Sequence, residues 1–145
     1  MNQGILGQVE SVLAAATTVG AMEMEASLAG RALVVIVDDR TAHGDGTDSI
    51  GPLVTELLSE AGFIVDAIVA VAADELEIRN ALNTAVIGGV DLVVSVGGTG
   101  VSPRDVAPDV TAEVLDREIP GIAEALRSSG LSAGSLDAGL SRGLA

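Results

Sequence analysis

The segment DLVVSVGGTGVSPRDVAPD, residues 91–109, is the most informative part of the chain. Its apolar run Leu92–Val96 predicts a buried strand, and Gly97-Gly98-Thr99-Gly100 predicts a tight turn that opens towards a helix. Ligands of open parallel sheets bind just beyond the carboxyl ends of the strands. Glycines at that place let backbone N–H groups approach a phosphate closely. The segment therefore predicts an anion site, with Arg104 facing an anion and Asp105 facing a metal ion.

Strands and helices alternate around this segment. Continuous apolar runs predict strands over residues 32–37, 63–71 and 92–96. Helical periodicity, capping residues and glycine stops predict helices over residues 51–61, 74–87, 109–115 and 119–128. Residues 131–145 read as a loop with a weak helical turn near Leu136. The pattern predicts an α/β fold with three α/β/α layers around a doubly wound, mostly parallel sheet.

Residues 1–29 differ from the rest of the chain in their sequence pattern. Ile5, Val9 and Val12 have the spacing of one amphipathic helix. No chemistry-bearing motif accompanies them, so residues 1–29 are interpreted as an N-terminal extension that is disordered or packs on a subunit surface. The α/β domain is expected to occupy residues 30–145.

Composition excludes several classes of partner and site. The net charge is −14, all seven basic residues are arginines and a single Phe is the only aromatic residue, so neither a nucleic acid nor an anionic membrane is expected as a partner. No cysteine is present and His43 is the only histidine, so any metal would be a hard ion held by carboxylates, with Mg²⁺ as the default. Without a basic leader or an apolar run approaching about 20 residues, the chain is expected in the cytoplasm.

Polar residues follow each predicted strand, and parallel strands bring such residues to one edge of the sheet. Asp39 and Thr41 follow the first strand and are candidates for a nucleotide-side loop, although a solvated polar loop would look the same. Asp74 follows the second strand and could hold a metal ion, or serve only as a helix N-cap. For Arg104 and Asp105 the alternative to a binding role is a local ion pair.

Five separated motifs, in order, resemble the MoaB/Mog family of molybdopterin-binding domains, of actinobacterial type. The glycine turn with Arg104-Asp105 resembles the family's GGTG signature and the Arg-Asp that follows it. The other matching segments are Val37-Asp38-Asp39-Arg40, Ala73-Asp74-Glu75, Glu118-Ile119-Pro120-Gly121 and Leu140-Ser141-Arg142. The chain departs from the family pattern at Ala107, where Thr is usual, and the family's C-terminal strand and helix are expected to be lacking.

The resemblance implies a homotrimer that acts in molybdenum cofactor biosynthesis, binding molybdopterin and adenylylating it with Mg²⁺-ATP. It makes Asp74 and Asp105 the essential acidic residues, catalytic and metal-binding. It places the glycine turn, Arg104 and Ser141 against the phosphate side of the pterin. It also implies a molybdate-inserting partner protein. The alternative functions are a non-catalytic molybdopterin-binding module and an interaction domain with the same fold.

Overall fold

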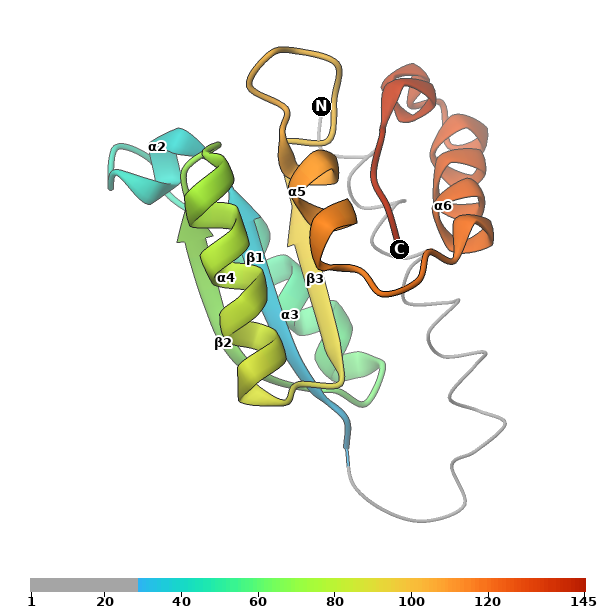
Figure 1. The fold of residues 1–145 in the computed structure, drawn as a ribbon. Coiled ribbons are helices and arrows are strands. Elements are labelled where there is room, and N and C mark those ends of the chain that lie inside the picture. Colours follow the sequence, from blue (N-terminus) through green and yellow to red (C-terminus); the bar gives the residue numbers. More distant parts are fainter. Residues whose placement is uncertain (1–28) are drawn as a thin grey trace.

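The structure, a computed structural model, describes residues 29–145 (Figure 1). The predicted helix near residues 5–13 lies outside the described residues. The alternation of strands and helices is confirmed. The elements are β1 (Arg31–Val37), α2 (Asp39–Ala42), α3 (Ile50–Glu60), β2 (Ile64–Val71), α4 (Glu75–Gly88), β3 (Leu92–Val96), α5 (Ala107–Val114), α6 (Pro120–Ser132) and the 3₁₀ helix η1 (Leu136–Leu140).

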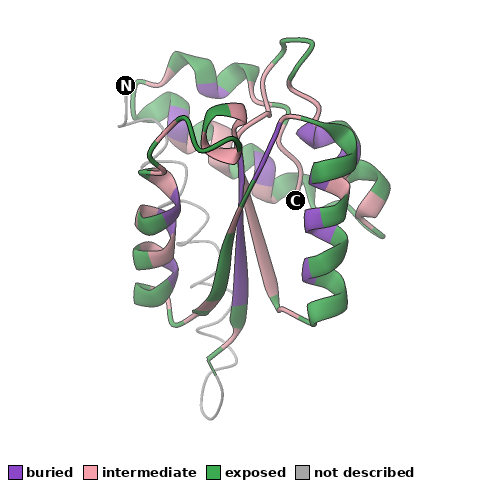
Figure 2. Cartoon of the chain, turned by 90° about the vertical axis from the view of Figure 1, so that its left-hand side faces the viewer, coloured by how far each residue is buried: buried purple, intermediate pink, exposed green. Residues whose placement is uncertain are grey.

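The described strands form one parallel sheet in the order β2-β1-β3. The connection through α3 leaves β1 in one direction, and the connection through α4 returns across β1 to reach β3. Because both crossovers of a parallel sheet take the same hand, the two helices must cover opposite faces. The apolar contacts agree, since α3 packs on one face and α4 and α5 pack on the other (Figure 2). The predicted doubly wound, layered fold is confirmed.

Strand β1 is the centre of the core. Its side chains alternate between two apolar clusters, with Val34 facing α3 and Val35 facing α4, and both are fully buried. From α3, Val54 and Leu58 are also fully buried against the sheet. Each such aliphatic side chain stabilises the fold by about 1.5–3 kcal/mol through burial. This packing fixes the carboxyl end of β1, where the candidate site begins.

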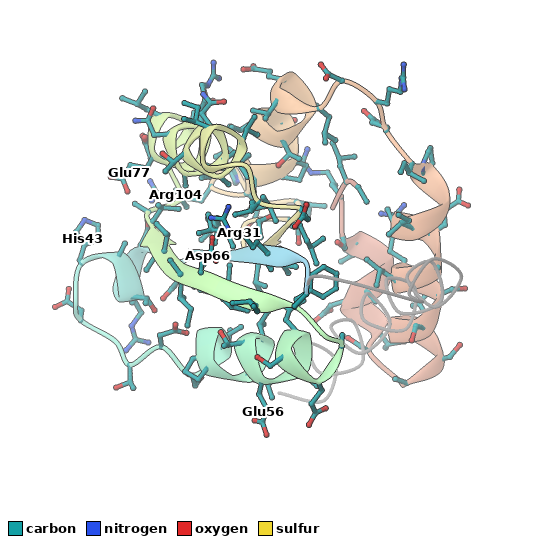
Figure 3. All side chains as sticks on the ribbon, turned by 90° about the horizontal axis from the view of Figure 1, so that it is seen from below. Arg31, His43, Glu56, Asp66, Glu77 and Arg104 are labelled. Carbon is teal, nitrogen blue, oxygen red and sulfur yellow. The ribbon has the colours of Figure 1, made fainter. Side chains whose placement is uncertain are left out.

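Strand β2 lies at an edge of the described sheet and carries a local irregularity. The pairing register with β1 shifts between Ala32 and Leu33, which leaves Asp66 as the extra residue of β2. Asp66 forms an ion pair with Arg31 at the amino end of β1 (Figure 3). A charge and a bulge on an edge strand discourage pairing with another chain. This ion pair lies at the end of the sheet opposite the candidate site.

Two helix boundaries differ from the prediction. The predicted start at Asp109 is wrong, because α5 begins at Ala107 and Asp109 lies in its first turn. Pro108 supplies the fixed backbone angle that suits the first turn of a helix, which explains the earlier start. The predicted end near Ser128 is also wrong, because α6 continues to Ser132, and the expected stop Gly130 is buried inside it.

Other predicted boundaries hold. Gly62 and Gly89 follow α3 and α4 with φ values of +90° and +66°, the left-handed geometry that glycine adopts without strain. The loop predicted after β1 contains the short helix α2, which the sequence analysis missed. None of the helices within residues 29–145 is long and apolar enough to cross a membrane.

The C-terminal segment returns towards the sheet. After η1, which packs against α6, residues 141–145 pass between β3 and α6 (Figure 1). The Arg142 N–H donates to the Thr99 carbonyl at 2.7 Å, and the Ile119 N–H donates to the Ala145 carbonyl at 2.6 Å. The segment therefore lies directly against the glycine-rich loop that follows β3.

Candidate functional site

Asp39 joins the loops that follow all the described strands. It stands just beyond β1, and its Oδ1 accepts a hydrogen bond from the Ala73 N–H, after β2, at 2.9 Å. Its Oδ2 accepts one from the Arg104 guanidinium, after β3, at 2.5 Å. The Ala73 N–H, followed by Arg104, holds the pKa of Asp39 below its usual value. The predicted gathering of polar residues at one sheet edge is therefore what the structure contains.

Asp74 has a structural task at this edge. It is the N-cap of α4, and its Oδ1 accepts hydrogen bonds from the N–H groups of Leu76 and Glu77 at 3.0 and 3.1 Å. The Glu77 carboxylate accepts in turn from the Ala72 N–H at 2.9 Å. The capping alternative considered for Asp74 is thus confirmed, while its catalytic and metal-binding roles stay predictions.

The glycine-rich loop lies tightly on the end of β1. Gly97 has a φ of +108°, and a Cβ there would lie 2.2 Å from the Val37 carbonyl oxygen. Gly98 has a φ of +63°, and a Cβ there would lie 3.1 Å from Val37 Cγ1 and 3.3 Å from Ala107 Cβ. Backbone packing therefore explains why these positions need glycine. The predicted approach of a phosphate to the loop stays a prediction.

The Asp105 carboxylate accepts hydrogen bonds from the backbone of the same loop. Its Oδ2 accepts a hydrogen bond from the Ser102 N–H at 2.9 Å. The Ser102 hydroxyl, then the Ser102 N–H, keep the pKa of Asp105 below its usual value, and the Gly100 N–H adds to the effect. A Cβ on Gly100 would lie only 2.7 Å from this carboxylate. The alternative of a local ion pair with Arg104 is wrong, because Arg104 pairs with Asp39 instead.

Arg142 is the contributor that the sequence analysis missed. Its Nε donates to the Gly100 carbonyl at 2.9 Å, and its Nη2 donates to the Asp105 carbonyl. The same guanidinium binds the Asp109 carboxylate through two hydrogen bonds of 3.2 and 3.1 Å. Arg142 lowers the pKa of Asp109. In the sequence, only the Leu140-Ser141-Arg142 motif pointed to Arg142. The motif lies far along the chain from the glycine-rich loop, so the sequence did not reveal the contact between them.

The remaining predicted residues flank this arrangement. Ser141 lies on the C-terminal segment beside the loop, and its Oγ accepts from the Gly143 N–H at 3.3 Å. Thr41 lies within α2, and its hydroxyl and its N–H donate to Oδ2 of Asp38, the N-cap of that helix, at 2.6 and 2.9 Å. The Thr41 hydroxyl is the main cause of the lowered pKa of Asp38. Ligand contacts by Ser141 and Thr41 stay predictions.

The acidic groups at this edge are dispersed. Within residues 29–145, no group of three or more His, Cys, Asp or Glu side chains is close enough to hold a metal ion. Asp74 and Asp105 each accept hydrogen bonds from the local backbone. A metal ion at this edge would therefore depend on oxygen atoms from a bound ligand as well.

A family model described as a probable molybdopterin binding domain matches residues 33–143. The chain belongs to this family. Among solved structures, a molybdopterin biosynthesis protein of Mycobacterium abscessus is 70% identical with a TM-score of 0.78, over 81% of this chain and 73% of that one. The MoaB enzyme of Thermus thermophilus is 37% identical with a TM-score of 0.73, over 79% and 72% of the two chains. The MoaB/Mog resemblance is confirmed.

Curated relatives of this molybdopterin-binding domain carry related names. A molybdopterin adenylyltransferase of Pyrococcus furiosus is 37% identical over 86 residues, which are 59% of this chain and 50% of that protein. A bifunctional molybdenum cofactor biosynthesis protein of Synechococcus elongatus is 36% identical over 101 residues, 70% of this chain and 32% of that protein. The chain thus spans between about a third and a half of these relatives.

Proposed function

We propose that this domain binds molybdopterin at the glycine-rich loop and transfers an adenylyl group to it from ATP, as a step in molybdenum cofactor biosynthesis. Relatives named molybdopterin adenylyltransferase, from Pyrococcus furiosus and Haemophilus influenzae, support the reaction class. The single observation that carries the proposal is the double contact of Asp39. It joins the turn before Asp74 to the loop that carries Arg104, so an acid, a cation and the glycine loop lie at one sheet edge.

The proposed reaction needs alignment and charge neutralisation more than covalent participation by the protein. A terminal phosphate oxygen of molybdopterin attacks the α-phosphorus of ATP, a new P–O bond forms, and the bond to the β-phosphate oxygen breaks. Pyrophosphate leaves with the bonding electrons. Arg104 and the loop N–H groups between residues 97 and 100 would neutralise phosphate charge. Ser141 would contact the phosphate side of the pterin, while Asp39 and Thr41 would line the nucleotide side.

Mg²⁺ fits this edge, because the side chains gathered there offer carboxylate oxygen and because Mg²⁺ ordinarily takes only one or two carboxylates plus substrate phosphates. Asp74 and Asp105 are the residues proposed to hold it. When bound, Mg²⁺ would neutralise the charge that develops on the phosphates. The protein's own part is to hold these two carboxylates in place through the backbone N–H groups that donate to them. For Asp105, the hydrogen bonds from Ser102 also lower the pKa of the carboxyl group.

The proposal includes an assembly and a location. A homotrimer in the cytoplasm, passing its product to a molybdate-inserting partner protein, is the arrangement that the family resemblance implies. Light scattering of the purified chain measures its mass in solution. A mass of one or two chains would contradict the trimer, while leaving the proposed reaction to be judged separately.

A second candidate function is molybdopterin binding without turnover. The observation that favours it is the use of the Asp105 carboxylate inside its own loop, where it accepts from the Ser102 N–H. A carboxylate that already accepts a hydrogen bond from its own loop is less available to coordinate a metal ion bound to a nucleotide. The same sheet edge would then bind the pterin for storage or for transfer to another protein.

Incubation with molybdopterin and Mg²⁺-ATP separates the two candidates. Adenylyl transfer predicts an adenylylated pterin and one pyrophosphate per product, whereas a storage module predicts binding with no pyrophosphate. Asp74→Ser is the sharpest variant, because serine retains the helix cap but removes the carboxylate. We expect this variant to keep its fold and to lose transfer. Unchanged turnover in Asp74→Ser would contradict the proposed role of the carboxylate.

A further inference from the structure

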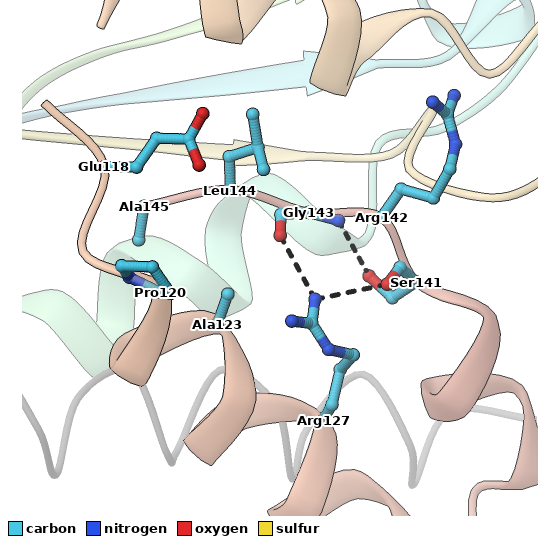
Figure 4. Close-up of a pocket in the computed structure, with 9 residues that line it drawn as sticks. All are labelled: Glu118, Pro120, Ala123, Arg127, Ser141, Arg142, Gly143, Leu144 and Ala145. Atoms are coloured by element: carbon cyan, nitrogen blue, oxygen red, sulfur yellow. Dashed lines mark hydrogen bonds between the residues drawn. The ribbon is translucent and has the colours of Figure 1, made fainter. Parts of the chain in front are cut away.

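Arg127 holds the C-terminal segment from one side. It projects from α6, and its Nη1 donates to the carbonyl oxygens of Ser141 and Gly143 at 3.2 and 3.3 Å (Figure 4). These two carbonyls flank Arg142 in the sequence. The direction of the backbone on both sides of Arg142 is therefore set by one guanidinium on a helix.

Arg142 then holds the glycine-rich loop from the other side. Its backbone N–H binds the Thr99 carbonyl, and its side chain binds the carbonyls of Gly100 and Asp105. In a planar trans peptide, the carbonyl and the N–H of the next residue point in opposite directions. Drawing the Thr99 and Gly100 carbonyls towards Arg142 thus turns the N–H groups of Gly100 and Val101 away from it. The Gly100 N–H accordingly faces the Asp105 carboxylate.

We infer that Arg127 and Arg142 act as a two-stage clamp, a pair of positioning residues that orients the donors of the glycine-rich loop for the phosphate of molybdopterin. The inference rests on the proposed function. Arg127 fixes the segment that carries Arg142, and Arg142 fixes the peptide planes of the loop. Neither residue needs to touch the reacting atoms.

The exposure of the clamp distinguishes it from ordinary stabilising contacts. The side chains of Arg142 and Asp109 are 41% and 64% exposed, so their ion pair contributes little to global stability. In the loop, by contrast, the Arg142 side chain holds the carbonyl of the peptide between Gly100 and Val101, while Asp105 holds the N–H groups of Gly100 and Ser102. Removal of Arg142 should therefore change ligand affinity much more than it changes resistance to unfolding.

Anaerobic titration with molybdopterin, beside thermal unfolding, tests the clamp. For Arg142→Ala we expect affinity to fall roughly 10- to 100-fold, the factor that corresponds to losing one charge-assisted hydrogen bond. Arg142→Lys should not restore it, because an ammonium group cannot replace the planar fork of donors. Added guanidinium ion should partly restore Arg142→Ala. Arg127→Gln should weaken binding in the same direction, by a smaller factor.

Arg79→Ala is the matched control. Arg79 lies on α4 and forms an exposed ion pair with Glu113 of α5 instead of binding the loop, so its loss should leave affinity unchanged. If wild-type protein binds molybdopterin and Arg142→Ala binds it equally well, the clamp is refuted. If wild-type protein binds none, the proposed function fails. The clamp is then decided by amide exchange at Gly100 and Ser102, whose N–H groups face the carboxylate of Asp105, the residue that the Arg142 side chain holds through its carbonyl. Exchange at these amides must become faster in Arg142→Ala, and unchanged exchange would overturn the clamp.

Discussion

Replacing Gly97 by Ala tests the tight seating of the loop on β1. The φ of +108° is strained for any residue with a Cβ, at a cost of about 1–3 kcal/mol. The new Cβ would also lie 2.2 Å from the Val37 carbonyl oxygen. Val37 is only 5% exposed and belongs to the central strand, so it cannot move aside freely. Overpacking of this kind adds about 1–3 kcal/mol. We therefore expect a total loss of about 2–6 kcal/mol.

Gly62→Ala is the matched control for this substitution. Gly62 also has a positive φ, +90°, but nothing lies within 4 Å of a Cβ built there. Its replacement should cost only the backbone strain, about 1–3 kcal/mol. Urea unfolding of both variants measures the difference. With an m value of about 1–3 kcal/mol per molar urea, the extra loss in Gly97→Ala moves the midpoint by roughly 1 M. Equal midpoints for the two variants would refute the clash with Val37.

Other predictions concern the buried Leu58, the helix cap at Asp74 and the loss of stability at acidic pH. Leu58→Ala should lower the free energy of unfolding by about 2–5 kcal/mol in urea, since Leu58 is fully buried; a loss below that range would contradict the assigned core. Asp74→Ser should unfold within about 0.5 kcal/mol of wild type, whereas Asp74→Ala should lose about 1 kcal/mol with the cap; equal losses would argue against capping. Because the pKa of Asp105 and of Asp109 is lowered in the fold, their stabilising contribution is complete above the unfolded value of about 3.9 and is lost as pH falls through the folded values. Asp109→Asn should flatten part of that acid dependence in a pH series of unfolding midpoints, and an unaltered series would count against the Arg142 ion pair.

The sheet and its helices were predictable because their signals are local. The β-branched run within β1 marks a strand buried on both faces, and Asp74 marks the start of α4. The same local signals misplaced the start of α5, where Pro108 competes with Asp109 for the first turn. Long-range geometry decides such cases, because several starting points satisfy the local pattern equally well.

The partners within the site were less predictable. Polar residues after each strand predicted one shared edge, and the structure confirms it through Asp39. The pairing of Asp39 with Arg104 spans 65 residues and the contact of Arg142 with Gly100 spans 42, so no spacing rule reveals either one. The sequence also did not reveal why glycine is needed at positions 97 and 98, because the reason is their close approach to Val37 at the end of β1.

In the function proposed above, the loop that follows β3 receives the phosphate of molybdopterin. Amide NMR spectra of the ¹⁵N-labelled chain, recorded during an anaerobic titration with molybdopterin, test it most directly. We expect the largest shifts on the amides of residues 97–105 and 141–143. Saturable shifts confined to other parts of the chain, or no shifts at all, would contradict it.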